Sequence, residues 1–452
     1  MLGDGVSPHL REFNSKEINP VFFSAAILIL SWYYLDILLI FFMLIYDKIL
    51  KNMAYIYRTN DSLSEGTVMT VTKQEYGKKK ANRRLRWIFL VFVLLLTTAI
   101  GLAHLHLGQK APVGIDALCP FGAIESAYTL IFTGVMLKRI AASSFILFFA
   151  VLLTAFLFRR SFCGFICPLG ALQEISAILG KKILGGHLTV PAVVDRPARL
   201  LKYFVLLLVV VFSAITGELV LRPYDPWVAY QHLTGADLFT NFQIGFAVLV
   251  LTLLGSFFFD RVFCKYLCPM GAFLAPFGRF GWFGIHRKEE TCLHCKACNN
   301  VCPVQIDVAG SARVDNMECI SCNECVNICP AGDTLSITGP KNAPGLPGRV
   351  VQEMVAAIFI LIIGVTTLTG NFQWKNPTLE EQVTAVGSFD PALIKGSMTL
   401  QEVVDSSGIP AQAFIERFKI EQADFQVPIK NIAQKYGFET EDVRLFTQDA
   451  SN

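Results

Sequence analysis

Residues 292–303 read CLHCKACNNVCP, and residues 319–330 read CISCNECVNICP. Both stretches have the spacing Cys-x2-Cys-x2-Cys-x3-Cys-Pro, in which three closely spaced thiolates hold one [4Fe-4S] cluster and the fourth cysteine ligates a second cluster. The pattern therefore predicts a module with two [4Fe-4S] clusters. Zinc also binds sets of four cysteines, but two full copies with trailing prolines favour iron and sulfide. Cluster 1 is expected to take Cys292, Cys295, Cys298 and Cys329, and cluster 2 is expected to take Cys319, Cys322, Cys325 and Cys302.

A different cysteine motif occurs twice earlier in the chain. Residues 160–172 read RSFCGFICPLGAL, and residues 261–273 read RVFCKYLCPMGAF. The apolar stretches before the two motifs align as well, so the sequence predicts a duplicated helical unit whose two copies end on the same side. The candidate ligands of a third centre, either a metal ion or a further iron–sulfur cluster, are Cys163, Cys167, Cys264 and Cys268.

The spacing of this second motif, Cys-x3-Cys-Pro, explains why it suits metal binding. Cysteines four residues apart lie on one face of a helix, and the proline that follows is typical of the first position of a new helix. We expect the adjacent Arg160 and Arg261 to favour the thiolate form. Four thiolates would match an iron–sulfur cluster or a tetrahedral metal ion. The alternative is that these cysteines are buried as small hydrophobic residues.

The composition places most of the chain in a membrane. Of its 452 residues, 53% are hydrophobic and only 17% are charged, whereas soluble proteins carry about 25% charged residues. The 13 cysteines lie in tight clusters, which excludes a secreted disulfide scaffold, and the net charge of +3 gives no reason to expect nucleic acid. Residues 123–137 are apolar but short, and we expect a re-entrant or interfacial helix there. Six longer stretches are predicted to span the bilayer: 22–46, 87–106, 141–158, 200–217, 243–259 and 351–369.

The distribution of lysine and arginine predicts the orientation. Residues 47–86 carry ten, residues 159–202 carry seven and residues 260–349 carry nine, whereas residues 107–140 carry three and residues 218–242 carry one. Basic loops stay in the cytoplasm, so both cysteine motifs are expected on the cytoplasmic side of the inner membrane. Both termini are then expected outside.

Together, these features resemble the NosR/NapH-type membrane ferredoxins, which include YccM-like polytopic proteins with [4Fe-4S] clusters. The resemblance covers about residues 85–335 and marks the twelve cysteines named above. It implies electron transfer between a quinol pool and a partner redox protein, or support for the maturation of a respiratory metalloenzyme. The chain departs from NosR because only about 20 residues precede the first predicted span, so a direct flavin route is not expected. It departs from short NapH-like members in its last span and long tail.

The expected fold class is mainly α. We expect a polytopic helical membrane protein of about six spans, with an inserted cytoplasmic two-[4Fe-4S] ferredoxin-like module and a small helical C-terminal domain. The tail shows a weak repeat that pairs Leu400 with Ile429 and Gly408 with Gly437. The expected parts are 1–86 (first span and basic loop), 87–275 (duplicated membrane domain), 285–335 (ferredoxin module), 351–369 (last span) and 370–452 (outward-facing tail).

Several features of the sequence have more than one interpretation at this stage. Asp36 lies within the first predicted span as a functional group or a structural partner. Cys119 is a ligand, a redox thiol or a packed residue. Glu174 is a proton relay or a partner of a helix dipole. The tail docks a partner subunit or is a passive fold. The linker cations Lys265, Arg279, Arg287 and Lys288 bind lipid phosphate or form a solvated face.

Two functions remain open from the sequence. The leading hypothesis is a membrane-bound electron relay between cytoplasmic-side [4Fe-4S] clusters and a quinone pool or a partner redox enzyme, for example as a subunit of a quinol dehydrogenase. The alternative is a maturation or redox-sensing membrane ferredoxin that supports a respiratory metalloenzyme. A solute transporter is disfavoured because paired broken helices around a midplane site are not apparent.

Overall fold

The structure is a computed structural model. It describes residues 73–107, 120–133, 142–374 and 379–451, with further short gaps inside the last two ranges. The predicted span 22–46, with Asp36, and Cys119 lie outside the described residues.

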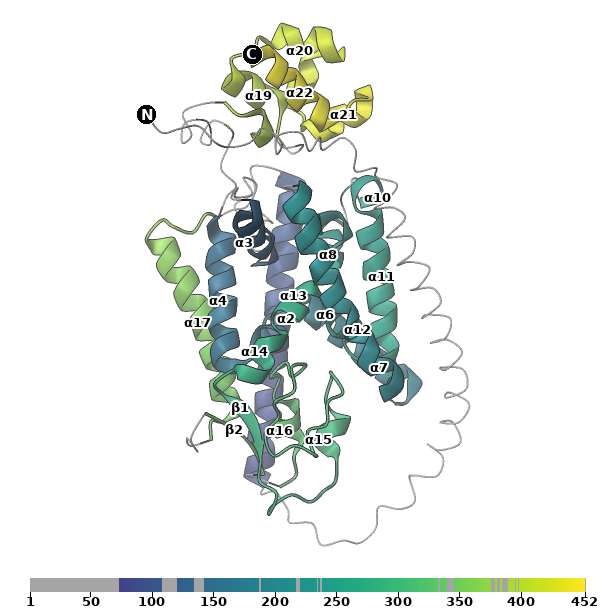
Figure 1. The fold of residues 1–452 in the computed structure, drawn as a ribbon, viewed down its shortest axis with the longest axis vertical. Coiled ribbons are helices and arrows are strands. Elements are labelled where there is room, and N and C mark those ends of the chain that lie inside the picture. The colour runs from purple at the N-terminus through teal and green to yellow at the C-terminus, as the bar shows by residue number, and fades with distance from the viewer. Residues whose placement is uncertain are drawn as a thin grey trace, which may run out of the picture. The chain divides into compact units, whose positions relative to one another are not determined.

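Five apolar helices correspond to the later five predicted spans, and Figure 1 shows them running roughly side by side. Three helical stretches are long and apolar enough to cross a membrane, namely Lys78–Ala103, Ala192–Ile215 and Gly348–Leu368, and α4 and α11 are shorter apolar helices. The chain is thus mainly helical, as predicted. The five helices are α2 (Lys73–Leu107), α4 (Ala142–Phe158), α8 (Leu201–Thr216), α11 (Gln243–Phe258) and α17 (Gly348–Leu368).

The duplicated unit is visible as two runs of helices in the same order. In the first copy, α2 is followed by α3 (Pro120–Thr133), α4, α5 (Ser161–Phe165) and α6 (Pro168–Leu184). In the second copy, α8 is followed by η4 (Arg222–Tyr224), α9 (Pro226–Gln231), α10 (Leu238–Asn241), α11, α12 (Val262–Tyr266), α13 (Pro269–Phe273) and α14 (Ala275–Phe280). Helix α7 (Ala192–Ala198) joins the copies. The helix expected at 123–137 is α3, which begins three residues earlier because Pro120 occupies its first position.

The two copies exchange their short helices. Helix α3 packs against α8 of the second copy, and α9 packs against α2 of the first. The side chain of Gln231 on α9 lies against Gly101 on α2, where a Cβ atom would lie 3.4 Å from it. The copies therefore form one interlocked bundle.

The ferredoxin-like module follows α14. Strand β1 (Gly284–Arg287) pairs antiparallel with β2 (Leu335–Thr338), with Gly284 opposite Thr338, and α15 (Ala297–Asn300) and α16 (Glu324–Ile328) lie between them in sequence. The chain enters the module along the end of α4, because the amides of Trp282 and Phe283 donate to the carbonyls of Phe156 and Leu157 at 2.9 and 2.8 Å. Ile285, Ile320 and Ile337 belong to the same buried core as Val151 and Phe158 of α4.

The C-terminal tail has a hydrophobic core of its own. It contains η5 (Pro391–Leu393), α19 (Leu400–Ser407), α20 (Ala411–Phe418), η6 (Gln422–Gln426), α21 (Ile429–Tyr436) and α22 (Thr440–Ser451). The repeat seen in the sequence corresponds to two helix pairs. Leu400 and Ile429 are both fully buried, and Gly408 and Gly437 end their helices with φ of 71° and 74°. Glycine is favoured there because this left-handed conformation is costly for other residues.

Candidate iron–sulfur site

The structure brings together the four cysteines expected on cluster 1. Burial raises the pKa of the Cys298 thiol, and Cys329 and Cys295 raise it further. Burial likewise raises the pKa of Cys329, and Cys295 and Cys292 raise this pKa further. The last cysteine of the second motif thus lies within electrostatic reach of the first motif.

The four cysteines expected on cluster 2 form a second group. Burial raises the pKa of Cys325 well above its ordinary value, and Cys322, Cys302 and Cys319 raise it further. Burial raises the pKa of Cys322 to about 12, with Cys302 again among the contributors. Cys298 of the first group also raises the pKa of Cys325, so the two groups adjoin, and both the crossed pairing and the ligation stay predictions.

The backbone around both groups is bent in the same way. His294 and Lys296 in the first motif have φ of 52° and 57°, and Ser321 and Asn323 at the equivalent positions of the second have φ of 50° and 61°. Left-handed residues of this kind turn successive N–H groups toward a common centre, and such nests line many iron–sulfur sites. The spacing of the cysteines did not indicate these bends, since none of the four residues is glycine.

The two Cys-x3-Cys-Pro motifs converge as well. Burial raises the pKa of Cys268 well above its ordinary value, and Cys264, Cys163 and Cys167 raise it further. Cys167 and Cys268 each precede a helix that begins with proline, as predicted. The amide of Gly271 donates to the Cys268 Sγ atom at 3.2 Å.

Arg261 favours the thiolate of Cys264 as expected, but burial outweighs this attraction. Burial raises the pKa of Cys264, and although Arg261 opposes this shift, the pKa stays raised. Buried thiols of this kind lose their protons when a metal supplies the compensating positive charge. The four thiols, of which Cys163 and Cys264 are buried and Cys167 and Cys268 are partly exposed, are therefore candidates to hold a metal or iron–sulfur centre.

The gathered cysteines can be compared with the spacing that a single metal ion needs. Among the described residues, no three or more histidine, cysteine or acidic side chains are gathered closely enough to hold one metal ion. A tetrahedral zinc site needs sulfur atoms within roughly 4 Å of one another, because each Zn–S bond is about 2.3 Å. A cluster takes one thiolate at each iron and spreads its ligands further apart.

The two copies exchange arginines across this site. The Arg261 Nη1 atom donates to the carbonyl of Cys163 at 2.6 Å, and a Cβ atom on Gly170 would lie 2.9 Å from Nη1. In the same way, a Cβ atom on Gly271 would lie 2.9 Å from the Arg160 Nη2 atom. The glycine of each Cys-Pro-x-Gly element thus makes room for the arginine of the other copy.

The first membrane motif also touches the ferredoxin module. A Cβ atom on Gly164 would lie 2.4 Å from the carbonyl oxygen of Ile320 and 3.2 Å from the Cα atom of Cys322. The equivalent residue of the second copy is Lys265, so this close approach is confined to the first copy. The motif of the candidate third centre and the motif of candidate cluster 2 are therefore in direct backbone contact.

Comparison with known proteins finds iron–sulfur families over the cysteine motifs. The family described as "4Fe-4S binding domain" matches residues 140–186 and 242–288, so each match covers one Cys-x3-Cys-Pro motif. The family described as "4Fe-4S dicluster domain" matches residues 284–330. The uncharacterized protein MJ0750 of Methanocaldococcus jannaschii is 34% identical over 196 residues, which cover 42% of this chain and 75% of that protein.

Named relatives identify the family. YccM of Escherichia coli (strain K12), provisionally named an electron transport protein, is 28% identical over 281 residues, covering 60% of this chain and 77% of that protein. The regulatory protein NosR of Stutzerimonas stutzeri is 29% identical over 228 residues, covering 49% of this chain and 29% of NosR. The chain belongs to the NosR/NapH-type family of membrane ferredoxins. No solved structure is significantly similar to it.

This NosR/NapH-type ferredoxin holds its module with basic side chains at the helix ends. On α2, the Lys79 Nζ atom donates to the carbonyl of Cys329 at 2.6 Å, and Arg83 and Arg86 pair with Glu324 at 2.7 and 3.1 Å. Three cations on one helical face thus contact the second cluster motif and its closing cysteine.

A second set of cations surrounds Glu318, next to Cys319. Lys202 donates to Glu318, and Arg160 and Arg199 pair with it at 3.3 and 3.8 Å. The Lys202 side chain is fully buried. The basic residues that predicted the orientation therefore act as structural partners of the module.

The lipid-facing or solvated role expected for Lys265 is wrong. This side chain is fully buried, and its Nζ atom donates to the Gln305 Oε1 atom at 2.9 Å and pairs with Asp195 at 3.4 Å. Arg287 is also occupied, since its side chain pairs with Glu289 at 3.5 Å.

Glu174 lies between two buried guanidinium groups. It accepts two hydrogen bonds from Arg86 and one from Arg261, each at 2.7 Å. Burial alone would raise the pKa of Glu174, but Arg86 and Arg261 outweigh burial and hold it at about 2. A carboxylate that stays ionised does not relay protons near neutral pH, so Glu174 is a structural partner.

Sequence reasoning missed Gln173. This fully buried side chain donates from Nε2 to the Cys264 Sγ atom at 3.2 Å, and its Oε1 atom accepts from the amide of Phe263 at 3.1 Å. Hydrogen bonds to ligand sulfur tune the reduction potential of iron–sulfur centres. The signal was an amide side chain next to Glu174, in the helix that begins directly after Cys167.

Proposed function

We propose that this chain relays electrons across its cysteine sites, between cytoplasmic-side [4Fe-4S] clusters and a quinone pool or a partner redox enzyme. The observation that carries the proposal is the contact of Gly164 with the backbone of Ile320 and Cys322. It joins the membrane motifs to the ferredoxin module without an intervening side chain. Iron–sulfur clusters supply one-electron transfer when bound.

The residues of the chain would hold and tune these centres. Cys292, Cys295, Cys298 and Cys329 are proposed for cluster 1, and Cys319, Cys322, Cys325 and Cys302 for cluster 2. Cys163, Cys167, Cys264 and Cys268 are proposed for a third centre. Gln173 and the amide of Gly271 donate to the sulfur atoms of this third set, and Arg160 and Arg261 offset its negative charge.

The proposed membrane layout has six spans, with the module in the cytoplasm and both termini outside. It rests on the five apolar helices, on the apolar stretch 22–46 and on the distribution of basic residues. The proposed parts are 1–86, 87–275, 285–335, 351–369 and 370–452.

Quinone as the membrane-side partner is part of the proposal. Quinone reduction takes up protons, and a buried carboxyl in the membrane domain can carry them. Glu125 on α3 is only 2% exposed and accepts hydrogen bonds from the Ser213 hydroxyl at 3.1 Å and the Leu221 amide at 3.4 Å. We assign the proton-handling role to Glu125 in place of Glu174.

The test is an iron and acid-labile sulfide count with EPR of the reduced protein. Wild type would be compared with a variant carrying Cys163→Ala, Cys167→Ala, Cys264→Ala and Cys268→Ala. We expect the variant to lose iron beyond the roughly eight atoms of two [4Fe-4S] clusters. Equal iron and identical spectra in both proteins would remove the third centre and break the proposed path into the membrane.

The alternative is a maturation or redox-sensing role. It is favoured by one observation, which is that the relative NosR is named a regulatory protein. In that case, the clusters of the purified protein would undergo reversible oxidation without turnover of added quinol. Stoichiometric reduction of the clusters by a quinol analogue, lost in Glu125→Gln, would support the relay instead.

A further inference from the structure

Helix α2 carries basic residues on two different faces. Lys79, Arg83 and Arg86 bond to the module, as described above. Lys80 and Arg84, one helical turn apart, belong to another face. That face borders a groove of about 480 Å³ between α2 and the start of α17, lined by Lys80, Ala81, Arg84, Leu85, Ile88 and Arg349.

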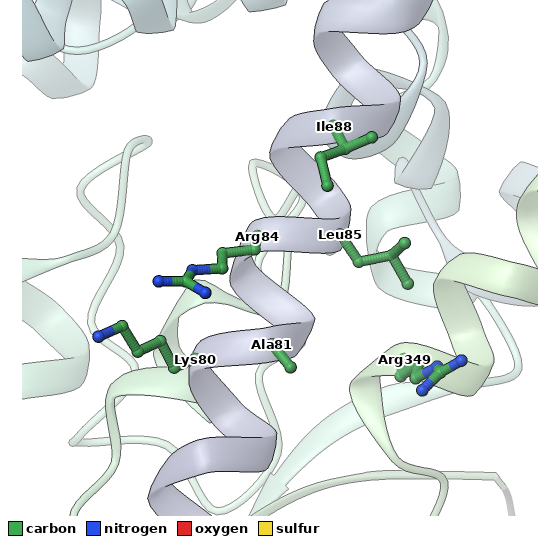
Figure 2. Close-up of a pocket in the computed structure, with 6 residues that line it drawn as sticks. All are labelled: Lys80, Ala81, Arg84, Leu85, Ile88 and Arg349. Carbon is green, nitrogen blue, oxygen red and sulfur yellow. The ribbon is translucent and has the colours of Figure 1, made fainter.

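The groove is positively charged. Figure 2 shows Lys80 and Arg84 extending to one side of α2, with Arg349 on the opposite side. Arg349 pairs with Glu353 at 2.6 Å, and both side chains are at least half exposed. In the part of the chain that the structure describes, no carboxylate lies within ion-pair distance of Lys80 or Arg84. Within the described residues, these two cations of the groove have no carboxylate as a partner.

The groove also lies at the boundary between the charged and the apolar part of α2. Leu85 and Ile88 begin the apolar part of α2, and Ile88 is 66% exposed. The stretches long enough to cross a membrane begin at Lys78 on α2 and at Gly348 on α17, so both helices enter the apolar layer here. A ligand for this groove needs an anionic group for the cations and a hydrocarbon part for Leu85 and Ile88.

We propose that this groove binds an anionic phospholipid, with its phosphate beside Lys80 and Arg84 and an acyl chain along Leu85 and Ile88. Basic pockets between membrane helices are known to hold anionic headgroups. A bound lipid would bridge α2 and α17. Because the other basic face of α2 holds the ferredoxin module, the lipid would also steady the docking of that module. The inference depends on membrane insertion and is independent of the proposed electron relay.

The test is native mass spectrometry of the full chain with its clusters, released from detergent supplemented with phosphatidylglycerol, with zwitterionic phosphatidylcholine or with inorganic phosphate. Wild type would be compared with K80Q/R84Q and with R349Q. The matched control is K182Q/R196Q, which removes two exposed cations outside the groove. Iron content and visible absorbance of each protein report that it has folded.

We expect wild type and the control to retain one phosphatidylglycerol. We expect K80Q/R84Q to bind it about thirty-fold more weakly, since each basic residue contributes about a factor of five at an anionic surface. We expect R349Q to show a smaller loss. Equal retention by K80Q/R84Q and the control would overturn the proposal, as would equal retention of phosphatidylcholine. Saturation of the groove by inorganic phosphate, with no preference for the lipid, would also overturn it.

Discussion

Gly164→Ala provides a direct test of how the membrane domain meets the ferredoxin module. The added Cβ atom would lie 2.4 Å from the Ile320 carbonyl oxygen, whereas ordinary contacts begin near 3.4 Å. The loop that carries Cys322 would have to move by about 1 Å. The obstructing atoms belong to the backbone, so no side-chain rotation relieves the clash. Overpacking of this kind costs about 1–3 kcal/mol.

The assay is the temperature at which the purified protein loses the visible absorbance of its clusters. A cost of about 2 kcal/mol corresponds to a drop of roughly 4–8 °C for a domain of 150–250 residues. The matched control is Gly364→Ala on α17, where nothing lies within 4 Å of the added Cβ atom. Alanine is the better helix former by about 1 kcal/mol, so the control is expected to be neutral or slightly stabilising. Equal midpoints for Gly164→Ala and wild type would refute the close approach.

Three further predictions concern the charges and the cysteines. Glu174→Gln leaves Arg86 and Arg261 without their shared anion and is expected to cost about 3–5 kcal/mol, measured in the same thermal assay; a loss below 1 kcal/mol would contradict this. Because the folded pKa of about 2 lies below the ordinary 4.5, the contribution of Glu174 is present above pH 4.5 and is lost as the pH falls toward 2. The difference between wild type and Glu174→Gln should therefore stay constant from pH 8 to pH 5, and a difference that already shrinks between pH 8 and pH 6 would speak against the assignment. Cys329→Ala should remove the EPR signal of cluster 1 and leave that of cluster 2, and the reverse outcome would mean that each motif holds its own cluster.

The local chemistry of this chain could be predicted from the sequence, because it is encoded in spacing. Pro168 and Pro269 restart helices directly after a cysteine, and Gly408 and Gly437 end helices in the tail, as expected. The long-range contacts could not be predicted in this way. Nothing in the spacing of Lys265 indicated that its ammonium group would be buried beside Asp195.

The electrostatic errors have one physical cause. The prediction from the sequence considered only the attraction between charges that are close in the chain. Arg261 was therefore expected to stabilise the thiolate of Cys264. In the folded protein, burial outweighs that attraction, and the pKa of Cys264 is raised. Arg261 instead donates hydrogen bonds to the Cys163 carbonyl and to Glu174, which belong to the other copy.

The same exchange explains why the duplicated unit has diverged. Arg160 and Arg261 are equivalent by sequence, yet Arg160 bonds to the Met317 carbonyl and Glu318 of the module, whereas Arg261 bonds within the membrane domain. The module lies against Gly164 of the first copy, where the second copy has Lys265, and against Gly278 of the second copy, where an added Cβ atom would lie 2.6 Å from the Met317 carbonyl oxygen. Because the two equivalent positions carry a glycine and a buried lysine, the pseudo-symmetric membrane site gives the ferredoxin module a single docking position. Lys265→Gly alone would therefore not create a second docking site, because Asp195 and Gln305 would lose their cation without any gain of contact with Cys322.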